Sequence, residues 1–225
     1  MPNSCATYHA VIDALKKSTL AANRAPQSVS LLAVSKRQSA AAIRELAGCG
    51  QRAFGENYLQ EAQQKISALS DLPLEWHFIG PLQSNKANEV ARLFDWVHTV
   101  DREKIAVRLN AARASMTKPL NVCIQVNISG ESTKNGIEPN DLADLQQKFA
   151  DFPHLKLRGL MALPAPQSDP ALQRNAFRQL HSLYTEVIGK QVDTLSIGTS
   201  ADYHAAILEG ATMVRIGTAL FGARD

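Results

Sequence analysis

Lys36 has the setting of a nucleophilic amine. It follows the apolar residues 31–34 and has the same parity as Leu32 and Val34, so the three side chains lie on one face of a predicted strand. If that face looks into a closed barrel, the amine points into the mouth of the barrel. Partial burial disfavours the ammonium form, lowers the pKa and lets the free amine attack an aldehyde. The alternative is a solvated lysine at the end of a strand.

Two turns near the C-terminus have the composition of a phosphate site. Ser196-Ile197-Gly198-Thr199-Ser200 ends one predicted strand, and Arg215-Ile216-Gly217-Thr218 ends the next. Glycines let backbone amides approach a phosphate, hydroxyls donate hydrogen bonds, and a helix N-terminus adds positive potential. Each turn alone is equally typical of an ordinary helix N-cap. Opposite a lysine at a strand end, the two turns together indicate a phosphate ester that carries an aldehyde, and pyridoxal phosphate (PLP) fits that description.

The cysteines and histidines lack the spacing of a metal site. The cysteines are odd in number, far apart and without a Cys-x-x-Cys pair, so we expect buried thiols and neither a disulfide framework nor a zinc site at Cys5, Cys49 and Cys123. The six histidines contain no ligand pair at helical i, i+4 spacing, so we expect no metal at His9, His77, His98, His154, His181 and His204.

The chain alternates short apolar runs with longer amphipathic segments. An opening helix is predicted over residues 5–23. Predicted strands cover residues 30–35, 52–54, 74–79, 96–100, 120–128, 155–161, 194–197 and 213–216. Predicted helices cover residues 39–48, 57–70, 84–94, 102–115, 140–149, 170–188 and 201–208, before a closing segment that reaches residue 225.

About eight strand–helix units predict a parallel sheet closed into a (β/α)₈ barrel, with an extra N-terminal helix and a single domain over residues 1–225. The competing arrangement is a doubly wound open sheet. However, the first strand is not followed by a Gly-x-Gly-x-x-Gly turn, and the usual open sheet has about six strands. In a barrel, chemistry belongs at the C-terminal ends of the strands, where Lys36 and the two turns lie.

Charge and hydropathy argue against nucleic acid and membranes as partners. The chain has 24 Lys and Arg against 21 Asp and Glu, a net charge of +3, and no polybasic block. The first 20 residues mix Asp13, Lys16 and Lys17 into their apolar positions, so they lack the unbroken apolar stretch of a secretory signal or a membrane span. We therefore expect a cytoplasmic protein.

Several short motifs between residues 31 and 224 occur in an order and spacing that are specific in combination. They are Ala33-Val-Ser-Lys36, Phe54-Gly-Glu-Asn-Tyr58 with Gln60-Glu61, Trp76-His-Phe-Ile-Gly80 with Leu82-Gln83 and Asn85-Lys86, Gln125-Val-Asn127 through Lys134 and Gly136, Leu160-Met161, and Arg215-Ile-Gly217 through Phe221-Gly222. With these motifs the chain resembles the pyridoxal phosphate homeostasis proteins, whose fold is like the N-terminal barrel of alanine racemase. It departs from the family by lacking a proline shortly after Lys36, and by having Ile197 and Thr199 where methionines are usual.

The resemblance implies how the cofactor would be held. Lys36 would form the internal aldimine with PLP. Ser200, Gly217 and Thr218 would hold its phosphate, and Gly198 would shape the turn. Because the Ser and Gly positions of the turn are kept, we expect the two replaced methionines to leave cofactor binding intact.

The resemblance also assigns residues around the ring and the pocket. Arg215 would face the pyridine nitrogen; an arginine there only donates, which makes the ring a weaker electron sink, although spacing alone would equally allow Arg215 to bind phosphate. Asn57 and His77 would line the pocket on the lysine side, although His77 fits equally well as a satisfied core histidine. Lys134 is either a surface lysine or a secondary amine that receives or relays the aldehyde.

Two functions of different class follow from the resemblance. The first is a carrier that binds PLP reversibly, buffers the free aldehyde and delivers it to apo-enzymes, without robust catalysis. The alternative is a PLP-dependent amino-acid racemase or a related enzyme. Racemisation needs a base on each face of the substrate carbon. In alanine racemase the second base comes from an additional domain of a partner subunit, which this sequence lacks, so Tyr58 or Tyr203 would have to replace it. We therefore expect a carrier and, without that interface, a monomer.

Overall fold

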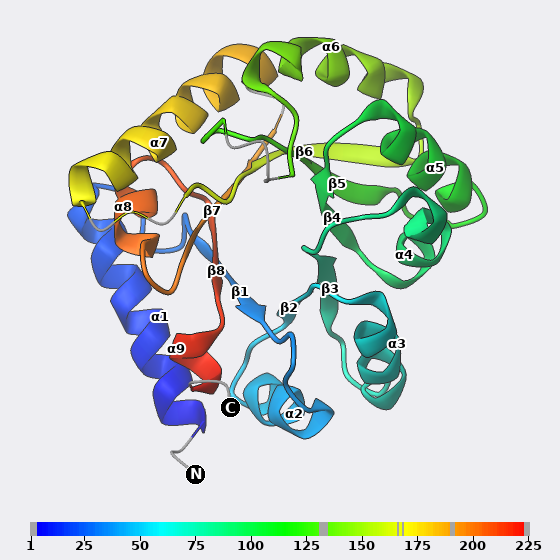
Figure 1. Cartoon of the computed structure of the whole chain (residues 1–225). Coiled ribbons are helices and arrows are strands. Elements are labelled where there is room, and N and C mark those ends of the chain that lie inside the picture. The colour runs from blue at the N-terminus through cyan, green and yellow to red at the C-terminus, as the bar shows by residue number, and fades with distance from the viewer. Residues whose placement is uncertain (1–3, 131–134, 166, 168, 190–191, 223–225) are drawn as a thin grey trace.

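A closed barrel of parallel strands forms the centre of the molecule. The computed structural model describes residues 4–130, 135–165, 167, 169–189 and 192–222. Within these residues each strand pairs with the next along the chain, and β8 returns to β1 (Figure 1). The strands are β1 (Ser30–Val34), β2 (Ala53–Glu56), β3 (Glu75–Phe78), β4 (Trp96–Val100), β5 (Leu120–Gln125), β6 (Leu155–Met161), β7 (Thr194–Thr199) and β8 (Met213–Ile216).

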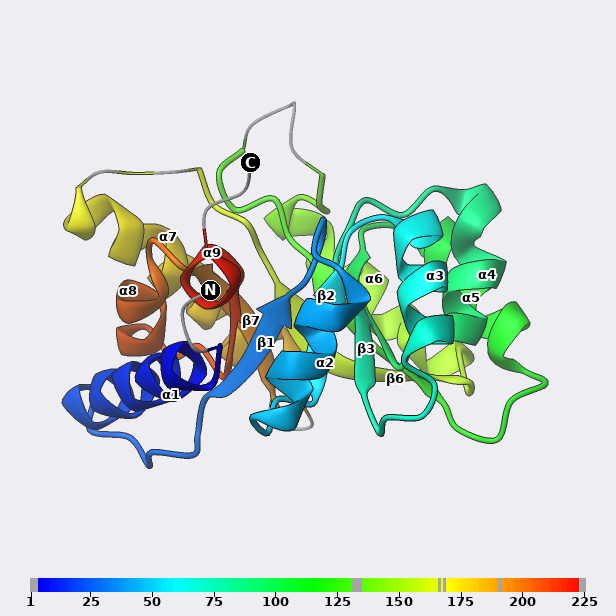
Figure 2. The ribbon, with the colours of Figure 1, turned by 90° about the horizontal axis from the view of Figure 1, so that it is seen from below.

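Helices surround the barrel and connect its strands (Figures 1 and 2). The α-helices are α1 (Ser4–Ala21), α2 (Ala40–Gly48), α3 (Leu59–Ala68), α4 (Ala87–Leu93), α5 (Glu103–Arg113), α6 (Leu142–Gln147), α7 (Pro170–Leu183), α8 (Tyr203–Leu208) and α9 (Thr218–Phe221). Short 3₁₀ segments cover Ser84–Lys86, Pro139–Asp141 and Lys148–Asp151, and a π-helical turn at Tyr184–Ile188 follows α7. The predicted (β/α)₈ barrel with an additional first helix is confirmed.

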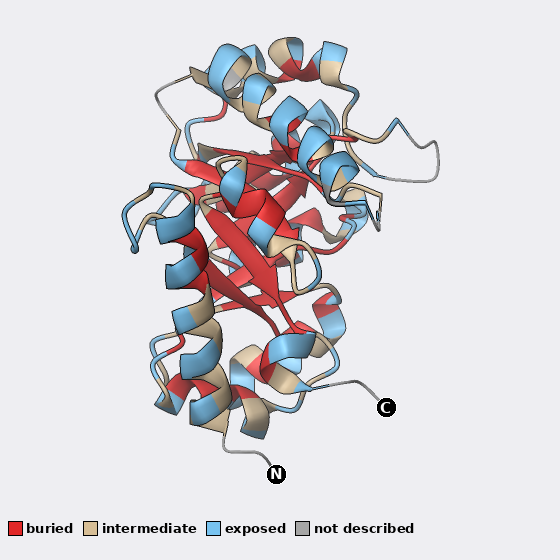
Figure 3. Ribbon diagram, turned by 90° about the vertical axis from the view of Figure 1, so that its left-hand side faces the viewer, coloured by how far each residue is buried: buried red, intermediate tan, exposed pale blue. Residues whose placement is uncertain are grey.

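The strands are buried on both faces, as parallel sheets covered by helices are (Figure 3). In β1 the side chains of Leu31 and Ala33 belong to the large apolar core shared with the surrounding helices. Leu32 and Val34 instead pack with Ile79 and Met213 in a separate apolar cluster. The parity argument for Lys36 is therefore supported, because the two faces of β1 bury different neighbours.

Predicted and observed boundaries differ mainly at the C-terminal ends of strands. The predicted strand over residues 120–128 ends at Gln125, after which Val126 forms a single bridge to Ile137. The predicted strand over residues 194–197 continues to Thr199. These ends carry the loops of the barrel mouth, where turn geometry rather than apolar periodicity decides where pairing stops.

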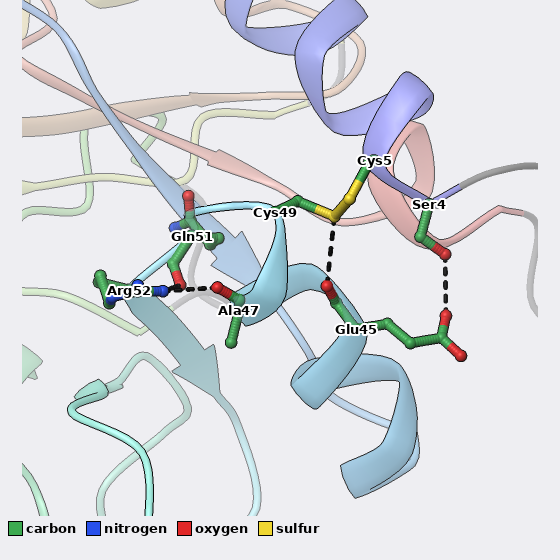
Figure 4. The surroundings of a disulfide bond; sticks show 7 residues. All are labelled: Ser4, Cys5, Glu45, Ala47, Cys49, Gln51 and Arg52. Carbon is green, nitrogen blue, oxygen red and sulfur yellow. Dashed lines mark hydrogen bonds between the residues drawn. A yellow bond between two sulfur atoms is a disulfide. The ribbon is translucent and has the colours of Figure 1, made fainter.

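The prediction that all three cysteines are free thiols is wrong for two of them. Cys5, in the first turn of α1, forms a disulfide with Cys49, which follows α2 (Figure 4). Next to it, Ser4 Oγ donates to Glu45 Oε2 at 2.9 Å. Sequence spacing hid this pair because the two cysteines are 44 residues apart and meet only when α1 packs beside α2. Cys123 is a buried free thiol as predicted, and burial raises its pKa to about 12.

The helices in the described ranges include none that is both long and apolar enough to cross a membrane.

Candidate functional site

A cavity of about 310 Å³ opens at the C-terminal ends of the strands. Among the residues that the structure describes, it is lined by Val34, Lys36, Asn57, Ile79, Leu163, Thr199, Ser200, Ala201, Arg215, Gly217 and Thr218. Six of the eight residues predicted from the sequence are in this set: Lys36, Asn57, Ser200, Arg215, Gly217 and Thr218. The structure therefore brings together the lysine of the first strand and the turns of the last two.

Lys36 lies just beyond β1 and is half-buried. The backbone hydrogen bonding between β1 and β2 continues past the end of β1, because the Ser35 N–H donates to the Gly55 carbonyl at 3.0 Å. Arg37 has a φ of +62°, a left-handed conformation that side chains other than glycine seldom adopt. Its N–H donates to the carboxylate of Glu61. The backbone is thus held on both sides of Lys36.

An ionic cluster of the buried residues Ser35, Glu56 and Lys65 with the partly exposed Glu61, here called the lysine-side cluster, supports this backbone. Lys65 Nζ donates to the Ser35 carbonyl at 2.7 Å, to Glu56 Oε1 at 2.8 Å and to the carboxylate of Glu61. The Ser35 hydroxyl also donates to Glu56 Oε1, at 2.6 Å. Burial raises the pKa of Glu56, and the hydrogen bonds from Lys65 and Ser35 oppose that shift.

Sequence reasoning did not give this cluster a role. One signal was present: Glu61 and Lys65 are four residues apart on α3, the spacing at which helical side chains pair. No such rule connects Glu56 to Lys65, because their contact depends on how α3 packs against β2.

Asn57 follows β2 and lines the cavity. Its Oδ1 atom is buried and accepts no hydrogen bond within the described part of the chain. The loop after β3 lies against it so closely that a Cβ atom on Gly80 would be 2.0 Å from the Asn57 carbonyl oxygen. A buried, unpaired amide oxygen beside a cavity is suited to receive a hydrogen bond from a ligand or from water.

The turn after β7 depends on glycine. Gly198 has a φ of +92°, and a Cβ atom there would lie 2.7 Å from the Cβ of Ala206 in α8. Asp202 Oδ1 accepts from the Thr199 N–H at 2.6 Å and from its hydroxyl at 2.9 Å, which closes the turn around Ser200. Gly198 does not line the main cavity; it lines a neighbouring cavity of about 250 Å³ that shares Arg215 with the first.

The turn after β8 completes the other side of the cavity. Gly217 is buried, and Thr218 begins α9. Strands β1 and β8 pair with Ala33 opposite Ile216, so this turn lies beside the end of the strand that carries Lys36. The first amides of a helix have no carbonyl partner within the helix and can donate to an anion.

Arg215 forms a buried donor at the cavity. Its Nη1 donates to the carbonyl and to the hydroxyl of Ser196, the latter at 2.8 Å, and its Nη2 donates to the Ala162 carbonyl at 2.8 Å. Desolvation lowers its pKa to about 10. The guanidinium therefore stays protonated at neutral pH and can only donate hydrogen bonds.

His77 lies in the barrel interior and does not line the cavity. Its Nδ1 is 2.9 Å from His98 Nε2, its Nε2 is 2.8 Å from Glu75 Oε1, and its ring stacks on Trp96 with the centroids 5.1 Å apart. This is the geometry of a satisfied core histidine, the alternative considered for it. Among the described residues neither Tyr58 nor Tyr203 lines the cavity, and Lys134 lies outside the described residues.

The described residues contain no group of three or more His, Cys, Asp or Glu side chains that would hold a metal ion. What the cavity offers instead is one lysine amine, a set of hydroxyl and glycine donors, a buried guanidinium and an unpaired amide oxygen. These groups match a small anionic ligand with an electrophilic carbon.

Comparison with known proteins agrees with this geometry. Residues 12–225 match the family described as "Alanine racemase, N-terminal domain". The pyridoxal phosphate homeostasis protein of Pseudomonas aeruginosa is 55% identical over 211 residues, which cover 94% of this chain and 91% of that protein.

Two solved structures are similar to this chain, one at moderate and one at low sequence identity. PipY of Synechococcus elongatus with PLP bound is 37% identical with a TM-score of 0.80, and the alignment covers 92% of this chain and all of that one. Alanine racemase from Corynebacterium glutamicum is 20% identical with a TM-score of 0.64, covering 95% of this chain and 62% of that one. The latter similarity shows the fold alone.

Proposed function

The chain belongs to the family of the alanine racemase N-terminal domain and, within it, to the pyridoxal phosphate homeostasis proteins. On this basis we propose that it binds PLP at Lys36 and serves the homeostasis of that cofactor. The observation that carries the proposal is the cavity in which Lys36 lies with Ser200, Gly217 and Thr218. When bound, PLP supplies an aldehyde that condenses with a primary amine and releases water.

The residues present fit such a group. Lys36 is the single lysine among the described residues that line the cavity. The glycine and hydroxyl turns after β7 and β8 suit a phosphate. The buried Oδ1 of Asn57 accepts no hydrogen bond within the described chain, so it is free to accept one from a ligand. In this proposal Arg215 faces the ring nitrogen, and Gly198 shapes the turn that presents Ser200.

Buffering and delivery of PLP are favoured over catalysis. A racemase needs a second base opposite the lysine. Tyr58 and Tyr203 were the candidates for that base, and neither is among the described residues that line the cavity. Arg215 retains its proton at neutral pH, so as a ring partner it would limit electron withdrawal by the pyridine and restrain carbanion chemistry.

Three further inferences concern the partners, the oligomeric state and the location of the protein. We infer that PLP-dependent apo-enzymes receive the cofactor, that the protein works as a monomer and that it works in the cytoplasm. The near balance of charge, at +3, and the absence of a polybasic block support a small-molecule partner over nucleic acid.

The test is to identify the modified lysine. Purified protein is incubated with PLP, reduced with borohydride and digested for peptide mapping. We expect the label on Lys36, and we expect Lys36→Ala to lose the visible absorption band of bound PLP while keeping its circular dichroism spectrum. The matched control is Lys86→Ala, an exposed lysine paired with Glu89, which should bind PLP as the wild type does. A label on another lysine, or a band that survives Lys36→Ala, would refute the proposed site.

A second measurement separates the carrier from the enzyme. The loaded protein is incubated with L-amino acids, and D-enantiomers are quantified. We expect negligible turnover. Conversion at about one per second or faster would be ordinary enzymatic catalysis and would contradict the carrier function.

A further inference from the structure

A continuous chain of hydrogen bonds crosses the barrel interior from Glu75 to Arg215; we call it the histidine chain. Glu75 Oε1 lies 2.8 Å from His77 Nε2, and His77 Nδ1 lies 2.9 Å from His98 Nε2. His98 Nδ1 lies 3.1 Å from the hydroxyl of Ser196, which accepts from Arg215 Nη1 at 2.8 Å. The members come from β3, β4, β7 and β8. The histidine chain thus joins opposite walls of the barrel.

The two ends of the histidine chain lie at opposite mouths of the barrel. Glu75 is the first residue of β3, and about half of its side chain is exposed. Arg215 is buried and lines the cavity at the C-terminal ends of the strands. Between them, His77, His98 and Ser196 are each 0% exposed. Solvent at the N-terminal mouth therefore contacts one end of the histidine chain, and the proposed ligand contacts the other.

The chemistry of the members allows one direction of donation. Arginine has donors only and the Glu75 carboxylate has acceptors only, so with two neutral rings the bonds run from Arg215 toward Glu75. His77 then donates from Nε2 to Glu75 and accepts at Nδ1 from His98 Nε2. His98 in turn accepts at Nδ1 from the Ser196 hydroxyl. Burial lowers the pKa of each histidine and so favours the neutral rings that this direction requires, each with its proton on Nε2.

The other titratable groups near the histidine chain form no direct hydrogen bond to His77 or His98 among the described residues. His77 is influenced by Asp95, whose carboxylate accepts from the Trp76 N–H, and by Arg158, which lies over the Trp96 ring. His98 is influenced by His77 and Arg215. Arg215 is influenced by Asp202 and by the buried thiol of Cys123. Glu75 is the carboxylate that bonds directly to a histidine of the chain.

We propose that Glu75, His77, His98 and Ser196 are positioning residues for Arg215, and that the carboxylate at one mouth of the barrel fixes how the guanidinium is presented to the ring of PLP at the other. The inference rests on the proposed function, because it takes Arg215 as the ring partner. Hydrogen bonds aligned head to tail polarise one another. The Glu75 charge therefore makes the Ser196 oxygen a better acceptor, which holds Arg215 Nη1 against the wall and leaves its remaining N–H groups for the cavity.

The first test uses the protein without PLP. Long-range ¹H–¹⁵N correlation spectra of uniformly labelled protein report the tautomer of each histidine, assigned with His77→Gln and His98→Asn variants. We expect both rings to be neutral at pH 7 and protonated on Nε2. A proton on Nδ1 of either ring, or a doubly protonated ring, would overturn the proposed direction.

The second test is a double-mutant cycle with PLP. Glu75→Gln keeps the size of the side chain and an acceptor oxygen but removes the charge. We expect about fivefold weaker PLP binding, measured by titration, and a displaced absorption maximum of the bound cofactor. The matched control is Glu103→Gln, a carboxylate paired with Lys148 on the outer surface, which should change neither value.

The other corner of the cycle is His98→Asn. Asparagine keeps a polar group near the position of Nδ1 but has none at Nε2, so it retains the contact to Ser196 and cuts the link to His77. In this background Glu75→Gln should have no further effect. Independent, additive effects would mean that Glu75 does not act through the histidine chain, and an unchanged spectrum in Glu75→Gln would refute the inference outright.

These outcomes remain separable from the proposed function. Wild-type protein that binds no PLP would refute the proposed function, while the histidine tautomers would still decide the direction of the hydrogen bonds. If His98→Asn fails to fold, Ser196→Ala replaces it in the cycle, because that change removes the hydroxyl and leaves the backbone carbonyl that Arg215 also uses.

Discussion

Two buried polar networks lie below the cavity, and they are built differently. The lysine-side cluster concentrates ionic groups within one segment of the barrel wall, where Lys65 bonds to two carboxylates and to the backbone beside Lys36. The histidine chain has its charges only at the ends, Glu75 and Arg215, with two neutral rings and a hydroxyl between them. The first network is compact, and the second crosses the interior.

The difference indicates two ways of placing a functional side chain. Lys36 is positioned through its backbone, because the cluster holds Ser35 and Arg37 on either side of it. Arg215 is positioned through its own Nη1 and Nη2 atoms, both of which bond to the barrel wall. Breaking the cluster should therefore cost mainly stability, whereas perturbing the histidine chain should alter mainly the environment of the ligand.

The largest effect is expected from Lys65→Met. Methionine matches the length of the lysine stem but leaves the Glu56 and Glu61 carboxylates without their cation. Removing one partner of a buried ion pair typically costs about 3–5 kcal/mol. Urea unfolding followed by circular dichroism measures the loss. The control is Arg44→Met, which breaks the exposed pair with Asp71 and should cost less than about 1 kcal/mol. Equal losses of unfolding free energy in Lys65→Met and Arg44→Met would contradict the stabilising role of the lysine-side cluster.

A somewhat smaller effect is expected from reducing the disulfide. The Cys5–Cys49 bond encloses β1 and Lys36 in one covalent loop, on the lysine side of the barrel. Opening such a loop typically costs about 2–4 kcal/mol. Thermal unfolding with and without dithiothreitol measures it, with Cys5→Ser/Cys49→Ser as a variant that should not respond to the reductant. We expect the tautomers of His77 and His98 to be unchanged, because the hydrogen bonds of the histidine chain are made by residues of β3, β4, β7 and β8, outside this loop.

The smallest effect is expected in the pH dependence of stability, to which the two histidines of the histidine chain contribute. Burial keeps His77 and His98 neutral in the folded protein, whereas in the unfolded chain they bind protons below about pH 6.5. This contribution to stability is therefore present above that pH and is lost as the pH falls, by up to about 1.4 kcal/mol per pH unit for a histidine that stays neutral in the folded protein. Between pH 6.5 and 5, the free energy of unfolding of the wild type should fall more steeply with falling pH than that of His98→Asn, by the contribution of one histidine. Parallel curves would mean that His98 is not held neutral.

The sequence predicted the barrel because each unit repeats a local signal. Apolar runs at Trp96–Val100, Leu155–Met161 and Met213–Ile216 coincide with β4, β6 and β8. Lys36 and the turns at Gly198 and Gly217 were also accessible from sequence, since residue type and position at a strand end suffice to mark them. Six of the predicted site residues do line one cavity.

What the sequence did not reveal depends on packing between distant segments. The Cys5–Cys49 bond, the Glu56–Lys65 pair and the His98–Ser196 contact each join elements whose relative placement no local pattern encodes. His77 illustrates the same limit. Its position on β3 suggested a pocket wall, but the strand is short and its parity places the ring deep in the barrel, where His98 and Glu75 satisfy it.

The pairing of β1 with β8 has a consequence for how the protein is made. Lys36 is translated well before Gly217 and Thr218, whose turn lies beside it in the barrel. Until Met213–Ile216 seals the cylinder against Ser30–Val34, the amine and the turns that surround it are not assembled. A nascent chain in which β8 has not yet paired with β1 would therefore have no complete binding pocket, and cofactor capture would report that the barrel has closed.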